Sequence, residues 1–455
     1  MIDSIFKSKW VPVSFQVFTL CIFIFLIYIG WGISTDDNEL LLILRNTNLA
    51  NLVVWSFWLP CIILVSVLFG RLWCTVCPME LMASLLNRVG LKKKLPSFLK
   101  KGWAITFLYA VVLIIGVHTF KIHRFPHRMA LYMIILFGLT IVLSFIFEKR
   151  AYCTAFCPIG HLLGLYSTNA LMEWRVKNKG VCNSCKEKPC INKNRDYAWY
   201  GRACQSYLFP GTLKDNRDCI LCTQCMKACP NDNVTFRFRK PFKDLFGELK
   251  LTVPQAGFIL IVFGFAFYEV VTEWGTSKSW ILSPFQALND RLGITSPWDG
   301  TVTALLLFFI APLVLFTLTS FLHSSVSKKG VFYSLKTYIT PFIPLIATTH
   351  FAKAVIKSVS RFQNIPGALK DPLGMETARA LHTGAMYAGN QWQYNMNKLA
   401  QVFSLGILAL GFFITLSLLI RLARNKKEPF PIFYVILSTG YILSTAVAIA
   451  GKAFF

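Results

Sequence analysis

Long apolar runs of about twenty residues dominate this chain of 455 residues. A helix needs about 20 mainly apolar residues to cross the hydrocarbon core of a bilayer. Backbone N–H and C=O groups find no water there, so continuous apolar runs can span a membrane only as helices. The sequence therefore predicts a polytopic α-helical membrane protein with about nine transmembrane helices, near residues 11–33, 49–71, 103–120, 129–147, 253–272, 302–322, 337–357, 399–420 and 431–451.

The charges that flank these runs predict their orientation. Lys7 and Lys9 precede the first run, and other basic clusters separate runs two and three, six and seven, and eight and nine. The positive-inside rule then places the N-terminus in the cytoplasm and the C-terminus outside, in the inner membrane of a prokaryote. One outer loop, with Lys121, Arg124 and Arg128, disagrees. Because the net charge of +26 lies mostly in these flanks, we expect membrane lipid and no nucleic acid as a partner.

Twelve of the 14 cysteines fall between residues 74 and 229, and no role is assigned to Cys21 and Cys61, which lie in apolar runs. The segment from Cys219 to Pro230 has the C-x2-C-x2-C-x3-C-P spacing of bacterial ferredoxins. In such a run three thiolates hold one [4Fe–4S] cluster and the fourth reaches a second cluster. A structural zinc site is the alternative interpretation.

A second, less regular set consists of Cys182, Cys185, Cys190 and, after 13 more residues, Cys204. The fourth cysteine of each set in a two-cluster ferredoxin crosses to the other cluster. This rule predicts two [4Fe–4S] clusters, and zinc stays an alternative for the second set. The first cluster would be held by Cys182, Cys185, Cys190 and Cys229, and the other by Cys204, Cys219, Cys222 and Cys225.

A repeated element ends the second and fourth apolar runs. The first copy reads Gly70-Arg71-Leu-Trp-Cys74-Thr-Val-Cys77-Pro78, and the second reads Lys149-Arg150-Ala-Tyr-Cys153-Thr-Ala-Phe-Cys157-Pro158. Because proline is favoured in the first turn of a helix, each Cys-Pro element predicts a following helix, which we expect along the membrane surface. The four thiols either meet around a third iron–sulfur or metal centre or remain reduced or redox-active thiols.

Two helix-ending Cys-Pro elements followed by a two-cluster ferredoxin segment resemble the membrane-bound polyferredoxin family. Its members include the membrane ferredoxin of periplasmic nitrate reduction and the membrane half of the nitrous-oxide reductase regulator; the ferredoxin accessory protein of cytochrome oxidase assembly is more distant. Cys153, Cys157 and Pro158 match the family's C-x3-C-P motif, whereas Cys74, Cys77 and Pro78 match it one residue short. The resemblance covers residues 49–230 and implies electron flow from quinol, or across the membrane, toward periplasmic reductases.

Ionisable residues inside spanning helices are rare and point to function. His350 and Lys353 share one helical face with Lys357, and Glu269 lies near the outer end of the fifth run. We interpret His350, Lys353 and Glu269 as a site for a quinone headgroup or for haem b, with His118 or His382 as the second haem ligand. The alternative is that the lysines extend to the interface and the histidines make local hydrogen bonds.

These patterns predict three domains and one leading function. Residues 1–147 are expected to form a four-helix membrane domain with the first Cys-Pro element. Residues 148–250 are expected to form a cytoplasmic segment with the second element and an inserted two-cluster ferredoxin-like α+β domain. Residues 251–455 are expected to form a five-helix membrane domain with an external loop, 358–397. We expect a membrane-bound iron–sulfur protein that passes electrons between cytoplasmic clusters and a quinone pool or an outer redox partner, as a quinol dehydrogenase or a subunit of a larger complex. A redox- or iron-sensing regulator or assembly factor is the alternative, and a transporter ranks third.

Overall fold

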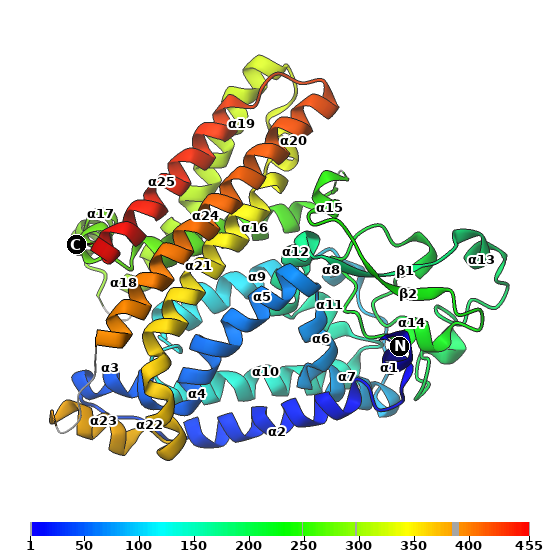
Figure 1. The fold of residues 1–455 in the computed structure, drawn as a ribbon, viewed down its shortest axis with the longest axis horizontal. Helices are drawn as coiled ribbons and strands as arrows, with labels where there is room; N and C mark the ends of the chain where they lie inside the picture. Colours follow the sequence, from blue (N-terminus) through cyan, green and yellow to red (C-terminus); the bar gives the residue numbers. More distant parts are fainter. Residues whose placement is uncertain (1, 248, 296–297, 385–390, 455) are drawn as a thin grey trace. The chain divides into compact units, whose positions relative to one another are not determined.

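The computed structural model describes residues 2–247, 249–295, 298–384 and 391–454, which are mainly helical and include one two-stranded sheet (Figure 1). The chain divides into two compact units. The first contains Met1–Leu26, Ile62–Ile105 and Met133–Gly247, and the second contains Ile27–Cys61, Thr106–Tyr132 and Glu248–Phe455. The three-domain division expected from the sequence remains a prediction. Residues 385–390 of the expected external loop lie outside the described residues.

Eight helices in the described part of the chain are long and apolar enough to cross a membrane. Each coincides with a run predicted from the sequence, and the remaining run, Trp103–Thr119, is a shorter apolar helix. The fold is therefore that of a multi-pass helical membrane protein, while the number of spans remains a prediction. The eight are α2 (Val13–Gly30), α4 to α5 (Leu49–Phe69), α10 (Pro126–Ile146), α16 (Val253–Val271), α18 to α19 (Asp299–Ser327), α20 to α22 (Val331–Lys370), α24 (Gln391–Lys426) and α25 (Ile432–Ala453).

Polar segments between the spans also form helices, which the sequence reading did not specify. In the second unit, α23 (Met375–His382) packs on α3 (Asn38–Thr47), and the Thr47 hydroxyl donates to the Gly374 carbonyl at 2.9 Å. Gly374 has φ of +74°, and a Cβ there would lie 2.4 Å from the Asn48 nitrogen, so only glycine fits. This close contact orders part of the expected external loop. The helix α17 (Gly275–Leu292) is a further element of this kind.

The cysteine-rich segment of the first unit is built around a strand pair. β1 (Met172–Val176) and β2 (Val234–Phe238) are antiparallel, with Val176 opposite Val234. The chain between these two valines leaves and re-enters at one end of the pair, and it carries all eight cysteines from Cys182 to Cys229. With the short helices α13 (Lys179–Ser184) and α14 (Gln224–Ala228), the segment is α+β, as predicted.

The N-terminal helix α1 (Ile2–Lys7) closes over this strand pair. The carboxylate of Asp3 accepts hydrogen bonds from the Thr235 hydroxyl at 2.7 Å and from the Phe236 backbone N–H at 3.2 Å. The ring of Phe6 packs edge-on against Trp174, with 5.0 Å between the ring centroids. The start of the chain is thus part of the cysteine domain.

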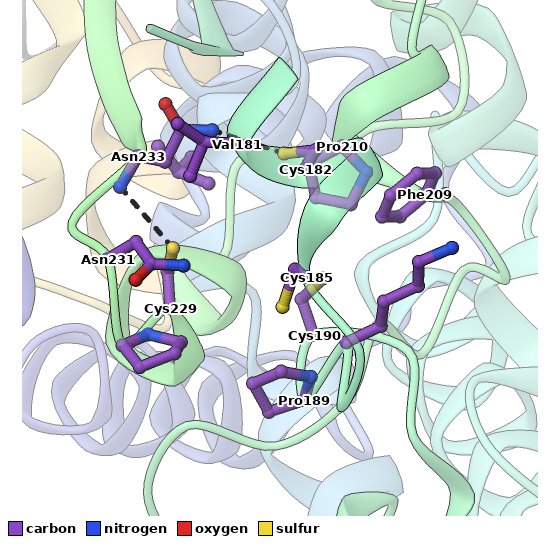
Figure 2. Close-up of a pocket in the computed structure, with 13 residues that line it drawn as sticks. Val181, Cys182, Cys185, Pro189, Cys190, Phe209, Pro210, Cys229, Asn231 and Asn233 are labelled. Carbon is purple, nitrogen blue, oxygen red and sulfur yellow. Dashed lines mark hydrogen bonds between the residues drawn. The ribbon is translucent and has the colours of Figure 1, made fainter. Parts of the chain in front are cut away.

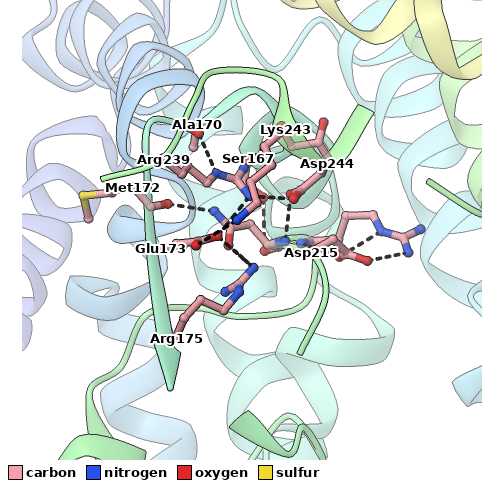
Figure 3. A network of polar contacts seen from close by, with 12 residues as sticks. Ser167, Ala170, Met172, Glu173, Arg175, Asp215, Arg239, Lys243 and Asp244 are labelled. Carbon is pink, nitrogen blue, oxygen red and sulfur yellow. Dashed lines mark hydrogen bonds and ion pairs between the residues drawn. The ribbon is translucent and has the colours of Figure 1, made fainter. Parts of the chain in front are cut away.

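A buried ionic network lies at the other end of the strand pair (Figure 3). The guanidinium of Arg239 pairs with Asp244 at 2.6 Å and lies 3.6 Å from Glu173. It also donates to the Ala170 carbonyl at 2.7 Å. The second carboxylate oxygen of Asp244 accepts the backbone N–H of Asn216 at 3.0 Å. The network therefore fixes the segment that leads into the ferredoxin run.

Replacing Asp244 by Asn should destabilise the first unit, because Arg239 would stay buried without its nearest carboxylate. Removing one partner of a buried ion pair costs about 3 kcal/mol or more. Urea unfolding in detergent, followed by near-ultraviolet circular dichroism, measures the loss. Asp232→Asn is the matched control, since Asp232 pairs with Lys7 on the surface and should change stability by less than about 1 kcal/mol. Equal small changes in both variants would contradict this account.

Candidate cluster-binding site

The first group of thiols lines one pocket of the first unit (Figure 2). Its members are the four that the crossing rule assigns to one cluster: Cys182, Cys185, Cys190 and Cys229. Asn233 donates from its backbone N–H to the Cys229 sulfur at 3.3 Å and from its side-chain amide to the Cys182 sulfur at 3.2 Å. Donors of this kind orient the sulfurs of metal-binding cysteines.

Burial opposes the thiolate form in this pocket. Burial, together with the neighbouring thiols Cys182 and Cys229, raises the pKa of Cys190 to about 11. The Cys190 thiol is therefore neutral near pH 7 unless a positively charged centre binds it, because metal binding requires the deprotonated ligand. The pocket fits a group that brings its own positive charge.

The second group of thiols lies beside the first. Cys225 interacts electrostatically with the other three members and also with Cys190 of the first pocket. Burial raises the pKa of Cys204 and Cys225, and it raises the pKa of Cys219 to about 12. The members are those predicted for the other cluster: Cys204, Cys219, Cys222 and Cys225.

Cys222 is the exception among these buried thiols. Burial alone would raise its pKa, but Arg150 and Arg202 outweigh that effect and bring the pKa below its ordinary value. A guanidinium nitrogen of Arg150 lies 3.6 Å from the Cys222 sulfur. The structure thus supplies fixed positive charge at one thiol of the second group, where it would stabilise a thiolate ligand.

The loop around Cys222 has an unusual backbone. Leu221 and Thr223 both have left-handed conformations, with φ of +58° and +62°. Such conformations cost about 1 kcal/mol or more for residues other than glycine, and they concentrate at functional sites. In this loop the backbone N–H groups of Leu221 and Gln224 donate to the sulfurs of Cys219 and Cys222. The strain is therefore coupled to hydrogen bonding at the thiols.

Two hydrogen bonds hold that loop against the rest of the first unit, and a third secures one of their donors, Thr75. The indole of Trp174 donates to the Leu221 carbonyl at 2.9 Å, and the Thr75 hydroxyl donates to the Ile220 carbonyl at 2.5 Å. The Thr75 carbonyl in turn accepts the side-chain amide of Gln16 on α2 at 2.8 Å. The ferredoxin run is thus anchored both to β1 and to the first Cys-Pro element.

A helix begins at the proline of each Cys-Pro element, as the sequence predicts. The short helices α6 (Leu72–Val76) and α11 (Ala151–Ala155) carry the first cysteine of each pair, and α7 (Pro78–Val89) and α12 (Pro158–Tyr166) follow. Proline has no N–H to continue the preceding helix, so carbonyl groups are left free there. The carbonyls of Thr75 and Val76 are two of these groups. They accept hydrogen bonds from the side chains of Gln16 and Thr19 on α2.

The two Cys-Pro elements bring their thiols together in a third group. Cys157 interacts electrostatically with Cys74, Cys77 and Cys153, and its sulfur accepts the backbone N–H of Gly160 at 3.2 Å. Burial raises the pKa of Cys77 and Cys153, and it raises the pKa of Cys157 to about 11. This group is therefore as suited to a positively charged centre as the other two.

A buried Arg-Glu-Arg triad joins the second and third thiol groups. Glu80, on α7, is ion-paired with Arg150 and with Arg202, the latter at 2.6 Å. All three side chains are buried, Glu80 with only 1% of its surface exposed. Arg150 belongs to the second Cys-Pro element and also contacts Cys222 of the ferredoxin run. The sequence patterns did not lead us to this triad. Its signals were the charged residues Glu80, two positions after Pro78, and Arg150, three positions before Cys153.

Arg71 is the counterpart of Arg150 in the first Cys-Pro element. It is buried, its side chain is hydrogen-bonded to Cys74, and it donates to the Arg217 carbonyl at 3.0 Å. α12 approaches it closely, because a Cβ at Gly160 would lie 2.9 Å from its guanidinium. Each element thus places an arginine, three residues before its first cysteine, among the thiols.

The predicted quinone or haem residues lie in the second unit. Lys353 is 3.6 Å from a carboxylate oxygen of Glu269 and is ion-paired more closely with Glu273. His118 and His350 both interact electrostatically with Glu269, so the structure brings these predicted residues together. His382 lies elsewhere in the unit, 3.8 Å from Asp37.

No group of three or more His, Cys, Asp or Glu side chains in the described ranges is placed to hold a single metal ion. The structure shows which thiols are neighbours, and their roles as ligands remain predictions. The same holds for the roles of His350, Lys353 and Glu269.

Residues 51–96 and 129–181 match a family model described as a 4Fe-4S binding domain. The matched segments contain both Cys-Pro elements and end just before Cys182. The match supports an iron–sulfur protein with an electron-transfer role, which agrees with the coarse prediction from the sequence. It is not specific to the nitrate- or nitrous-oxide-linked relatives, so that finer resemblance stays a prediction.

Two proteins of Methanocaldococcus jannaschii are similar to part of the chain. The uncharacterized protein MJ0750 is 26% identical over 196 residues, which cover 39% of this chain and 76% of that protein. The uncharacterized protein MJ0749 is 25% identical over 184 residues, which cover 38% of this chain and 67% of that protein. No solved structure matches the chain.

Glu80→Gln should destabilise the first unit, because Arg150 and Arg202 would remain buried without a counter-charge. Breaking a buried ionic group in this way costs about 3–5 kcal/mol. Urea unfolding in detergent under anaerobic conditions measures the change. Glu187→Gln, at an exposed glutamate of the same unit, is the control and should be neutral. Unchanged stability in Glu80→Gln would show that the triad does not hold the elements together.

Gly160→Ala should displace Arg71 from the third thiol group, because the new methyl group would clash with its guanidinium. We expect a loss of about 1–3 kcal/mol, as for overpacking of a buried contact. Thermal unfolding of the purified chain measures it. The control is Gly138→Ala, where no heavy atom lies within 4 Å of the added Cβ and the higher helix propensity of alanine should slightly stabilise α10. The same response at both glycines would argue against the close approach of α12 to Arg71.

Proposed function

We propose that this chain is a membrane-bound electron-transfer protein whose three thiol groups hold iron–sulfur clusters. The observation that carries the proposal is the adjacency of the groups within one compact unit. Cys190 of the first group interacts with Cys225 of the second, and Arg150 joins Cys222 of the second to the element that contains Cys153 of the third. The groups therefore follow one another in the order expected of an electron relay.

The residues of this chain contribute orientation and charge to such a relay. When bound, iron–sulfur clusters supply one-electron chemistry, and the surrounding hydrogen bonds and charges set their potentials. Asn233 would donate to the sulfurs of the first group, and Arg150 and Arg202 would place positive charge on the second. Arg71 would do the same at the third. Positive charge and N–H donors stabilise the reduced state of a cluster relative to the oxidised state.

The third group would be the station next to the membrane. Its cysteines follow directly on spanning helices, Cys74 after the one that ends at Phe69 and Cys153 after the one that ends at Ile146. We infer that electrons pass there to or from a quinone pool or an outer redox partner. A quinone headgroup at His350, Lys353 and Glu269 is our proposal for the acceptor, with haem b as the alternative; buried ionisable groups in spanning helices support a functional site.

The setting of the protein is also a proposal. We place it in the inner membrane of a prokaryote, with the N-terminus and the cysteine domain in the cytoplasm and the C-terminus outside. We propose that it works as a quinol dehydrogenase or as a subunit of a larger oxidoreductase complex, with a redox protein as its partner. Contacts between α1 and the strand pair support a common side for the N-terminus and the cysteines.

Single-turnover oxidation by a quinone tests the electron-transfer role. Full-length protein, purified without oxygen and reduced with dithionite, should be reoxidised on mixing with a water-soluble quinone, as seen from the visible absorbance of the clusters. Cys153→Ser should slow this step by about tenfold or more, since even indirect partners of a metal centre change its activity by that factor. Cys61→Ser, at an exposed cysteine outside the three groups, is the control.

Iron and sulfide present in the protein, but no reoxidation by quinone, would exclude the quinone-linked function. That result would favour a sensor or an assembly factor. Equal rates in Cys153→Ser and Cys61→Ser would remove the third group from the electron path.

A further inference from the structure

The helix α21 (Ile343–Arg361) presents three cations on one face, because Lys353, Lys357 and Arg361 are spaced by four residues. Only the first of them is neutralised locally. Lys353 is ion-paired with Glu269 and Glu273, and Glu273 is also ion-paired with Lys452. The nearby carboxylates are thus already engaged by two lysines.

The next two cations on that face contact neutral groups. Arg361 donates to the hydroxyl of Ser56 at 3.0 Å, and the ammonium of Lys357 lies 5.4 Å from the centre of the Trp55 ring. Neither residue forms a direct ion pair within the described part of the second unit. Both are largely shielded from solvent.

Two arginines from other elements join this cluster. Arg45, on α3, interacts electrostatically with Arg361 and with Arg124, which follows the helical segment Trp103–Thr119. Neither arginine has an ion-pair partner among the residues that the structure describes. The Arg45 Nε and the His123 Nδ1 are buried and, in the same ranges, lack hydrogen-bond partners. Donor groups in this cluster are therefore left for a ligand, since buried polar atoms are normally satisfied.

The backbone is also irregular at this place. Trp55 and Ser56 lie in a π-helical segment, Val53–Trp58, and His118 lies in another, Val112–Thr119. π-Helical turns are rare and often mark functional sites. The ring of Trp55 is 6.1 Å from that of His123, so the first segment borders the cationic cluster.

The charges of this region do not balance. Among the described residues, six basic side chains face two carboxylates, so four of the basic groups lack an acidic partner; the six are Arg45, Arg124, Lys353, Lys357, Arg361 and Lys452. Like charges that are shielded from water repel strongly, because the effective dielectric constant is low. A bound anion removes that repulsion and pairs with the unsatisfied donors.

We propose that Arg45, Arg124, Lys357 and Arg361, with His123, form a binding site for a phosphate group. Guanidinium groups match the geometry of phosphate oxygens, and a doubly charged oxyanion suits a cluster with several unpaired cations. The phosphate belongs either to the headgroup of an anionic phospholipid or to free inorganic phosphate. This site shares no residue with the thiol groups, and the inference does not depend on the function proposed for them.

Anion-dependent unfolding of the full-length protein in a zwitterionic detergent tests the proposal. Inorganic phosphate should raise the unfolding temperature more than chloride at equal ionic strength if free phosphate is the ligand. If the ligand is a lipid, nanodiscs containing phosphatidylglycerol should stabilise the protein more than nanodiscs of phosphatidylcholine. A phosphate effect no larger than that of chloride, together with equal stability in both lipids, would overturn the proposal.

Substitutions separate a binding role from a structural one. Lys357→Gln should weaken binding of phosphate or phosphatidylglycerol about tenfold or more, the usual effect of losing a hydrogen bond to a charged group. It should not lower the unfolding temperature of the ligand-free protein, because it removes a repulsive charge. Arg124→Gln should show the same weaker binding and unchanged ligand-free stability. It serves as the test variant if Lys357→Gln does not fold. Lys370→Gln, at an exposed lysine that ends α22, should leave the affinity unchanged.

Reduced ligand-free stability with unaltered affinity in both cluster variants would show that these cations only support the fold. Unaltered affinity in Lys357→Gln together with a loss in Lys370→Gln would place the site elsewhere, and it would equally overturn the proposal.

Discussion

Glu80 and its two arginines occupy the point at which the distant parts of the first unit converge. A buried carboxylate is tolerated only when cations pair with it, and here the two cations come from different segments. Arg150 belongs to the second Cys-Pro element, and Arg202 belongs to the loop that carries Cys204. Neutralising Glu80 therefore requires that the two Cys-Pro elements and the ferredoxin-like segment be assembled together. The same two arginines supply positive charge at Cys222, so assembly and electrostatics at the thiols depend on one set of contacts.

This arrangement explains why the arginine is repeated in both Cys-Pro elements. In each copy an arginine precedes the first cysteine by three residues, and each arginine is buried among thiols of more than one segment. Arg71 interacts with Cys74 and with Cys157 of the other copy, while Arg150 interacts with Cys153 and with Cys222 of the ferredoxin run. Guanidinium groups remain charged when buried, which makes them suitable fixed charges beside a redox centre. The repeat thus provides both the thiols of the third group and the charges that connect it to the second.

Sequence patterns predicted the parts of this molecule that depend on local chemistry. Apolar runs located the helices because length and hydropathy decide what a bilayer accepts, and the prolines at 78 and 158 located helix starts because of their missing N–H. Spacing also predicted which thiols become neighbours, including the placement of Cys229 beside Cys182. The Glu80 triad was not predictable in this way, because its members are 70 and 122 residues apart along the chain. The cationic cluster was missed for a related reason: Arg45 and Arg361 lie in segments that read as loops, and π-helical turns leave no mark in hydropathy.

The metal content of the native protein tests the central claim most directly. Full-length protein purified without oxygen would be analysed for iron, acid-labile sulfide and zinc, and its dithionite-reduced form would be examined by electron paramagnetic resonance. Three four-thiol groups predict about twelve irons and twelve sulfides per chain, with interacting cubane signals. Zinc without sulfide would contradict an iron–sulfur relay altogether. About eight irons would leave two clusters and contradict the station at Cys74, Cys77, Cys153 and Cys157.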